Sequence, residues 1–177
     1  MDTPVQNKSL IYTFDELKED VYCVTFNPTG DLLASASYRS IALWDICSNK
    51  LVHRINEDIC HTVSFSPDGE LLASGGSNLK LWNANTFELV ETLKEKKENQ
   101  NLIISLKFSP NSEVLASGDY TVSLWDVATG VLLQTFNGLE QSDSVYSIAY
   151  SKDGENIFAG CNDSKIKIWC KLCNKRK

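Results

Sequence analysis

Tryptophan recurs along this chain at nearly regular intervals. The four tryptophans are separated by 38, 43 and 44 residues and are Trp44, Trp82, Trp125 and Trp169. A second aromatic series keeps the same irregular period and consists of Phe26, Phe65, Phe108 and Tyr150. Self-similarity with a period of about 20–50 residues is typical of repeat architectures. The chain is therefore predicted to contain four copies of one structural unit.

Each unit is predicted to be built from short β-strands. In the first strand, residues 21–26, alternation places Tyr22, Val24 and Phe26 on one face. Second strands, most with a small Ala-Ser pair that allows close packing, are predicted at 32–35, 71–74, 114–117 and 157–160. Third strands ending in tryptophan are predicted at 41–44, 79–82, 122–125 and 166–169. Fourth strands are predicted at 51–55, 89–93 and 132–136.

A turn separates the first two strands of every unit. The first two turns read Asn27-Pro-Thr-Gly30 and Ser66-Pro-Asp-Gly69, in which proline fixes φ at the second position and the first residue caps the turn. The third turn ends in Ser112 and lacks glycine, and the fourth has Lys152 in place of proline. The remaining residues still fit a type I turn, so we expect all four turns to form.

These residues resemble the WD40 family. Asp45 and Asp126 complete the Trp-Asp dipeptide, whereas Asn83 and Cys170 replace the aspartate. The resemblance covers roughly residues 9–170 and implies an all-β propeller of four-stranded antiparallel blades around a central channel, with four blades per chain. The predicted organisation is one domain at 1–170, with repeats at about 21–55, 59–93, 102–136 and 145–170 plus a strand at 9–14, and a C-terminal tail at 171–177.

The two ends of the repeat array are related. Residues 10–14 copy the fourth strands at 89–93 and 132–136, whereas no fourth strand follows Trp169. The family resemblance implies that this N-terminal strand completes the last blade, which protects an otherwise open edge. Three arrangements remain open: a closed four-bladed monomer, a head-to-tail homodimer forming an eight-bladed ring, and a half-propeller that needs a partner chain. The wider ring suits these repeats somewhat better.

The units depart from the family in a buried polar network. WD40 repeats often carry a Gly-His before the first strand, an aspartate in the hairpin between strands two and three, and a serine near the second strand, all bonded with the tryptophan. Here no Gly-His occurs, and the hairpin aspartate survives only as Asp163. We therefore expect the network to be mostly missing. Losing it as a whole costs little when no buried partner is left unpaired, so the fold should persist.

Catalytic and metal-binding motifs are not found. The two histidines, His53 and His61, fall inside predicted strands and are read as structural. No nucleophile elbow, Walker loop or Gly-x-Gly-x-x-Gly occurs, so neither enzymatic activity nor a cofactor is predicted. Cys170 and Cys173 have zinc-ligand spacing, but a structural zinc site needs four ligands and no second pair is present. We predict no metal.

Composition narrows the class of partner and the location. A net charge of −6 gives no general attraction to phosphate, which disfavours nucleic acid as a partner. No apolar run approaches the roughly 20 residues of a membrane helix, and the first residues do not read as a secretory signal. Cys23 and Cys60 fit apolar strand patterns as free thiols. These observations predict a cytoplasmic protein without a membrane span, with the nucleus as the alternative.

The resemblance implies a non-catalytic scaffold that binds partner proteins or peptides on one propeller face. That face would be formed by the loops before strand one and the hairpins between strands two and three. The candidate partner-binding residues are Tyr38, Arg39, Ser77, Asn78, Asp119, Tyr120, Asn162 and Asp163. The insertion at 94–101 is a solvated loop or a further contact. The alternatives are a propeller that binds nucleic acid or phospholipid head groups, and a truncated WD40 protein lacking an independent role.

Overall fold

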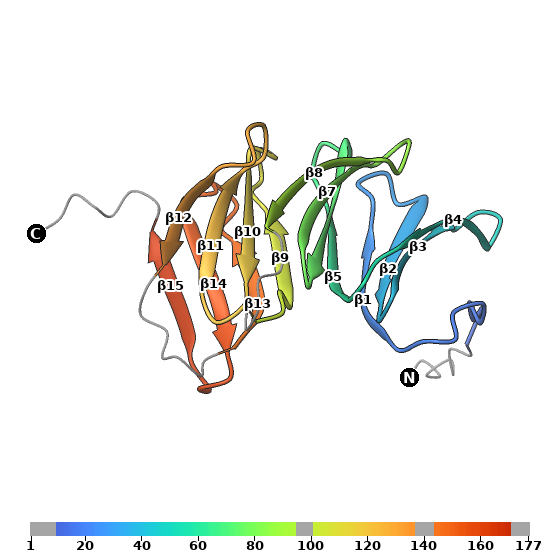
Figure 1. The fold of residues 1–177 in the computed structure, drawn as a ribbon, viewed down its shortest axis with the longest axis horizontal. Coiled ribbons are helices and arrows are strands. Elements are labelled where there is room, and N and C mark those ends of the chain that lie inside the picture. Colours follow the sequence, from blue (N-terminus) through green and yellow to red (C-terminus); the bar gives the residue numbers. More distant parts are fainter. Residues whose placement is uncertain (1–9, 95–100, 137–143, 171–177) are drawn as a thin grey trace, which may run out of the picture.

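The computed structural model describes residues 10–94, 101–136 and 144–170, which form fifteen β-strands and no helix. The strands make four separate antiparallel sheets, each in chain order (Figure 1). Three sheets have four strands, and the fourth has three among the residues described. The predicted all-β propeller architecture with four blades is confirmed. No described helix is long and apolar enough to cross a membrane.

The strands follow the predicted units closely. Blade 1 consists of β1 (Val21–Phe26), β2 (Leu32–Ser37), β3 (Ser40–Asp45) and β4 (Lys50–Asn56). Blade 2 consists of β5 (Cys60–Phe65), β6 (Leu71–Gly76), β7 (Leu79–Asn83) and β8 (Leu89–Lys94). Blade 3 consists of β9 (Ser105–Phe108), β10 (Val114–Gly118), β11 (Val122–Asp126) and β12 (Leu132–Phe136). Blade 4 consists of β13 (Val145–Tyr150), β14 (Asn156–Cys161) and β15 (Ile166–Cys170).

All four predicted turns between first and second strands are formed. In blade 1 the amide of Gly30 donates to the carbonyl of Asn27 at 3.1 Å, and Gly30 has a φ of 80°. In blade 3 the amide of Ser112 donates to the carbonyl of Ser109 at 3.0 Å, and Ser112 has a φ of 62°. The Ser112 hydroxyl also accepts a bond from the amide of Asp68 at 3.2 Å, which ties the turns of blades 2 and 3 together.

The core lies between successive blades. We call the side of a blade that packs on the next blade its forward face, and the side that packs on the preceding blade its backward face. The forward face of blade 1 contributes Ala34, Ala36, Ile41 and Leu43 to the first cluster. The backward face of blade 2 contributes Val63, Phe65, Leu72 and Trp82. Equivalent clusters join blade 2 to blade 3 and blade 3 to blade 4. Each blade thus buries both faces only when it has a neighbour on each side.

Small residues in the second strand allow this close packing, as the sequence predicts. A Cβ added to Gly75 in β6 would lie 2.7 Å from Cγ2 of Ile103 and 2.9 Å from Cγ2 of Thr62. A Cβ added to Gly118 in β10 would lie 2.7 Å from Cγ1 of Val145. Because these approaches are shorter than carbon–carbon contact, any side chain there would push neighbouring blades apart.

The tryptophan part of the polar network is present in three blades. The indole Nε1 donates at 2.9 Å to the hydroxyl of a buried serine two residues beyond the tryptophan's cross-strand neighbour. The pairs are Trp44 with Ser35, Trp82 with Ser74, and Trp125 with Ser117. The expectation of a mostly missing network is therefore wrong for this bond. The bond needs only a serine on the adjacent strand, and neither the histidine nor the aspartate is required.

The register of blade 4 differs from the alignment that residue types suggest. Ile157 lies opposite Trp169, as Leu72 lies opposite Trp82. Ile157 is therefore the equivalent of Leu72, one position away from the predicted match of 157–160 with 71–74. Ala159 consequently occupies the place that Ser74 holds in blade 2. The predicted alignment was wrong because Phe-Ala-Gly resembles Leu-Ala-Ser. The turn gives the correct alignment, since Ile157 follows Gly154 by three residues, as Leu72 follows Gly69.

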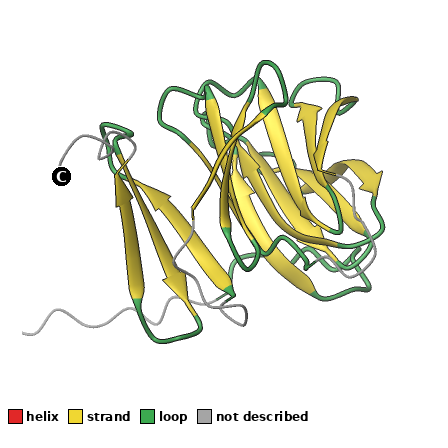
Figure 2. Ribbon diagram, turned by 60° about the vertical axis from the view of Figure 1, so that its left-hand side comes forward, coloured by secondary structure: helices red, strands yellow, loops and turns green. Residues whose placement is uncertain are grey.

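The four blades form an open arc, with blade 1 and blade 4 at opposite ends (Figure 1). Figure 2 shows the three-stranded sheet standing at one end of the array. Residues 10–20 form no strand; instead the ring of Phe14 packs on Trp44 of blade 1, with centroids 4.7 Å apart. The predicted completion of the last blade by residues 9–14 of the same chain is therefore wrong for residues 10–14. Blade 4 lies too far along the arc to be reached, which also excludes the closed four-bladed monomer. Residue 9 and the tail at 171–177 lie outside the described residues.

Candidate partner-binding surface

The hairpins between the second and third strands lie on the same side of the four blades. Backbone hydrogen bonds attach each hairpin to the segments that enter the first strands. The amide of Ser77 donates to the carbonyl of Ile59 at 3.1 Å within blade 2. Across blades, the amide of Ile103 donates to the carbonyl of Gly76 at 2.9 Å, and the amide of Val145 to that of Asp119 at 2.9 Å. The candidate residues therefore lie along one continuous side of the arc of blades.

Most of the candidate residues are accessible. Tyr38 is 44% exposed and Tyr120 is 38% exposed, and Arg39 and Asn162 are exposed as well. Asn78, Asp119 and Asp163 are half-buried. Ser77 is buried, so its side chain does not present itself to a partner. We call the remaining seven residues the hairpin face: Tyr38, Arg39, Asn78, Asp119, Tyr120, Asn162 and Asp163.

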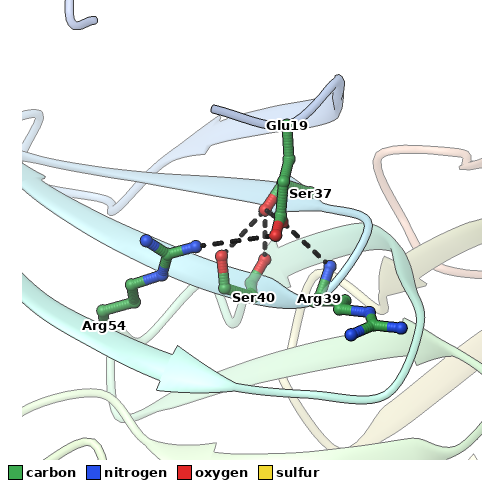
Figure 3. A network of polar contacts seen from close by, with 5 residues as sticks. All are labelled: Glu19, Ser37, Arg39, Ser40 and Arg54. Atoms are coloured by element: carbon green, nitrogen blue, oxygen red, sulfur yellow. Dashed lines mark hydrogen bonds and ion pairs between the residues drawn. The ribbon is translucent and has the colours of Figure 1, made fainter. Parts of the chain in front are cut away.

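Glu19 organises the hairpin of blade 1 (Figure 3). Its Oε2 accepts bonds from the Ser37 hydroxyl at 3.2 Å and from the Arg39 amide at 3.1 Å. Nη2 of Arg54 lies 3.9 Å from Oε1. One carboxylate from the segment before β1 therefore holds the ends of β2 and the hairpin together. Glu19 was not predicted as a site residue, because the family pattern places a Gly-His dipeptide before the first strand. The available signal was an acidic residue two positions before that strand.

The same hairpin presents a paired aromatic and cationic group. The guanidinium carbon of Arg39 lies 5.6 Å from the centroid of the Tyr38 ring. A guanidinium at that range is attracted electrostatically by the ring face. Because the Arg39 backbone is bound to Glu19, the pair is displayed on a fixed support.

A second carboxylate occupies the corresponding region of blade 2. Glu57 precedes β5, and its carboxylate, only 5% exposed, accepts bonds from Nζ of Lys80 at 2.9 and 3.1 Å. The Glu57 amide also donates to the carbonyl of Arg39 at 2.9 Å, which joins blades 1 and 2. Asn56 and Asp58 complete a shallow pocket of about 190 Å³ with this ion pair. This pairing could not be predicted from local sequence patterns, because 23 residues separate its two members.

A second cavity lies beside the hairpin of blade 3. It has a volume of about 350 Å³ and is lined by Asn101, Leu102, Ile104, Asp119, Tyr120 and Ser144. Oδ1 of Asp119 accepts bonds from the Thr121 amide at 2.8 Å and from the Thr121 hydroxyl at 2.9 Å. These bonds fix the hairpin and leave Tyr120 at the edge of the cavity. An exposed ring beside a polar hollow can hold a peptide side chain.

In blade 4 the hairpin charges are largely neutralised. The carboxylate of Asp163 lies 3.1 Å from Nζ of Lys167 and 3.3 Å from Nζ of Lys165. Burial raises the pKa of Asp163, but hydrogen bonds from Lys167 and Lys165 outweigh it and leave the pKa below its ordinary 3.8. Oδ1 of Asn162 accepts from the Ser144 amide at 3.0 Å. Both side chains therefore help to shape the hairpin.

The two histidines and the Cys60 thiol lie outside the hairpin face. His61 packs on Tyr22 with centroids 4.6 Å apart, and His53 packs on Phe87 at 5.0 Å. Burial lowers the pKa of His61 and raises the pKa of the Cys60 thiol to about 12, which keeps this cysteine unreactive. Within the described parts of the chain, no three His, Cys, Asp or Glu residues cluster as metal ligands would. Cys173 lies outside them.

Comparison with known proteins identifies the repeats. The WD40 family, described as "WD domain, G-beta repeat", matches residues 8–45, 48–83, 87–126 and 130–170. The small ribosomal subunit protein RACK1 of Candida albicans is 32% identical over 152 residues, covering 84% of this chain and 36% of that protein. RACK1 of Drosophila melanogaster is 31% identical over 84% of this chain and 50% of that protein. MST50-interacting protein 11 of Pyricularia oryzae is 31% identical over 89% of this chain and 54% of that protein.

Solved structures agree on the fold. "Structure of U3-55K" superposes with a TM-score of 0.75 at 21% identity, covering 87% of this chain and 50% of that one. "Crystal structure of RRP9 WD40 repeats" gives the same TM-score and identity over 86% and 48%. The chain thus spans about half the length, or less, of the proteins it matches. The last three family repeats each run from the outer strand of one blade through the first three strands of the next, and the four repeats together cover all fifteen described strands. This chain therefore belongs to the WD40 family.

Proposed function

We propose that this protein is a non-catalytic scaffold that binds partner proteins or peptides through the hairpin face. WD40 proteins generally mediate protein interactions. The observation that carries the proposal is the exposed Tyr38–Arg39 pair on a hairpin fixed by Glu19. Tyrosine and arginine are among the residue types most enriched at binding hot spots. A fixed hairpin loses little conformational entropy when it binds, which favours affinity.

The partner in this proposal is a protein and the location is the cytoplasm, with the nucleus as the alternative. A net charge of −6 works against binding to phosphate backbones or anionic lipids. The names of two relatives fit a protein-bound role, since one is a small ribosomal subunit protein and the other is named for interaction with MST50. Tyr120 and its neighbouring cavity of about 350 Å³ offer a second contact point on the same face.

Affinity capture with quantitative mass spectrometry tests this proposal. The variant carries Tyr38→Ala and Tyr120→Ala, which remove both exposed rings of the hairpin face. The control is Val90→Ala, because Val90 is 53% exposed on β8 of blade 2 and lies outside the hairpin face. We expect the double variant to lose at least one partner that wild type and control both capture. Retention of every partner by the double variant would refute the face assignment.

The alternative functions predict different outcomes. A propeller that binds nucleic acid or phospholipid head groups would show salt-dependent binding to RNA or anionic liposomes. A truncated WD40 protein without an independent role would fail to give a cooperative melt. We expect no salt-dependent binding and a single cooperative transition.

A further inference from the structure

The backward face of blade 1 exposes apolar positions that are buried in the internal blades. Val63 in blade 2 is 3% exposed, whereas Val24, which occupies the same register position in blade 1, is 58% exposed. Phe65 is 7% exposed, and its equivalent Phe26 is 55% exposed. The side chains are of the same type in both blades. The exposures differ because blade 1 packs on the backward face of blade 2, whereas no described blade packs on the backward face of blade 1.

The forward face of blade 4 shows the same contrast. Leu79 in blade 2 is fully buried, whereas its equivalent Ile166 is 74% exposed. Leu81 is fully buried, and its equivalent Ile168 is 60% exposed. Both ends of the arc therefore retain the residues of a blade-to-blade joint.

Gly160 provides a second indication at the same end. It occupies the position of Gly75, where a Cβ would lie 2.7 Å from Cγ2 of Ile103 in the next blade. At Gly160 the nearest atom among the described residues is Cβ of Ser147 at 4.0 Å, which belongs to the same blade. The small residue found at this position in all three internal joints, which is Ala36, Gly75 or Gly118, is thus also present at the end of the arc.

Phe14 shows what the missing neighbour resembles. Its ring packs on Trp44 with centroids 4.7 Å apart, and Phe136 likewise contacts Trp169, with centroids 5.3 Å apart. Phe136 is the last residue of β12, the outer strand of the blade that precedes Trp169. Residues 10–14 copy residues 132–136 in sequence. The N-terminal segment therefore lies where the outer strand of a blade preceding blade 1 would lie.

We propose that a second copy of this chain supplies that blade. The forward face of its blade 4, with Ile166, Ile168 and Gly160, packs on the backward face of blade 1, with Val24 and Phe26. Residues 10–14 of one copy lie beside β15 of the other, which has only β14 as a neighbour among the described residues. The contact repeats at the other junction, which closes a two-fold ring of eight blades, within the roughly 4–8 blades known for propellers.

Phe158 distinguishes this joint from the internal ones. Blade 4 carries Phe158 where the forward faces of the other blades carry Ala34, Ala73 and Ala116. The joint between copies is therefore bulkier at this point than the three within the chain. The variant Phe158→Ala restores the small residue, so we expect it to keep the dimer.

Light scattering tests the proposal by measuring the mass of the full chain in solution. Wild type is compared with variants that carry a charge on one of the two faces. Wild type is expected at twice 19.8 kDa. Val24→Asp and Ile168→Asp each place a charge in both joints and should reduce the mass to one chain. Val90→Asp is the matched control, because Val90 is 53% exposed on β8, away from both faces, and should remain a dimer. Because Val24 and Ile168 are exposed within one chain, their variants should keep a cooperative melt.

Mixing the two charged variants separates this geometry from other dimers. One chain then retains an intact blade 4 face and the other an intact blade 1 face, so an equimolar mixture should recover a mass of two chains through one intact joint. A dimer made by like faces would survive one of the two substitutions and would gain nothing from mixing. That result, or a wild-type mass of one chain, overturns the proposal.

Discussion

The indole nitrogen of Trp82 donates a 2.9 Å hydrogen bond to the hydroxyl of Ser74 on the buried face of blade 2 that packs on blade 1. Ser74→Ala leaves a buried N–H without this acceptor, which should cost about 1–3 kcal/mol of unfolding free energy. Urea unfolding measures the loss. In a Trp82→Phe background no donor is left unpaired, so adding Ser74→Ala should cost much less. An equal cost in both backgrounds would show that the bond contributes nothing.

The ion pair of Glu57 and Lys80 should matter more to stability than that of Glu19 and Arg54. Lys80→Met leaves a carboxylate that is 5% exposed without its cation, and roughly 3 kcal/mol should be lost, at the low end for buried pairs. Arg54→Met removes a guanidinium that is 39% exposed and 3.9 Å from its partner, so the loss should be about 0–1 kcal/mol. Chemical denaturation of the two variants compares them directly; equal losses would contradict the difference in burial.

The turns after the tryptophans predict a response to acid. Hydrogen bonds from the Thr129 hydroxyl and amide hold the pKa of Asp126 below its ordinary 3.8. A carboxyl with a lowered folded-state pKa contributes stability that is present above 3.8 and is lost as pH falls through the folded-state value. In blade 2 Oδ1 of Asn83 is the acceptor at this turn, for the amides of Asn85 and Thr86 at 2.9 Å.

Asp126→Asn should therefore keep the stability of the protein at neutral pH and lose less of it in acid. Urea midpoints at about pH 7 and about pH 3 provide the measurement. Asp126→Ala is the control, because it removes the acceptor and should be less stable at both values. If the urea midpoint falls as much in Asp126→Asn as in wild type between these pH values, Asp126 is not a source of the acid sensitivity.

Gly75 and Gly160 form a matched pair for blade packing. Gly75→Ala would force Cβ against Ile103 and Thr62, so overpacking should cost about 1–3 kcal/mol. Gly160→Ala meets no atom closer than 4.0 Å in the described parts of the chain and should change stability by less than about 0.5 kcal/mol. Thermal unfolding in a Val24→Asp background, where the proposed joint between copies does not form, compares the two. A tolerated Gly75→Ala would mean that the blades are less closely packed than described.

Local features of the fold could be predicted from the sequence because they depend on neighbouring residues. The strands of each unit follow from alternation, and the four turns follow from residues such as Pro28 and Gly30. The candidate residues Tyr38 and Tyr120 were placed on hairpins correctly for the same reason. Ser77 was not recognised as buried, because its burial depends on bonds from its hairpin to Ile59 and Ile103, which lie far away in the sequence.

The repeat, the strands and the turns were thus determined by the sequence alone, since period and residue type are local properties. Tertiary structure decided the partner of Glu57, the register of Ile157 and the position of Phe14 on Trp44. It also decided that the four blades form an open arc. The physical reason is that curvature and closure depend on packing between faces about one repeat apart. The angle of that packing depends on the combined shapes of both faces, which no single segment encodes.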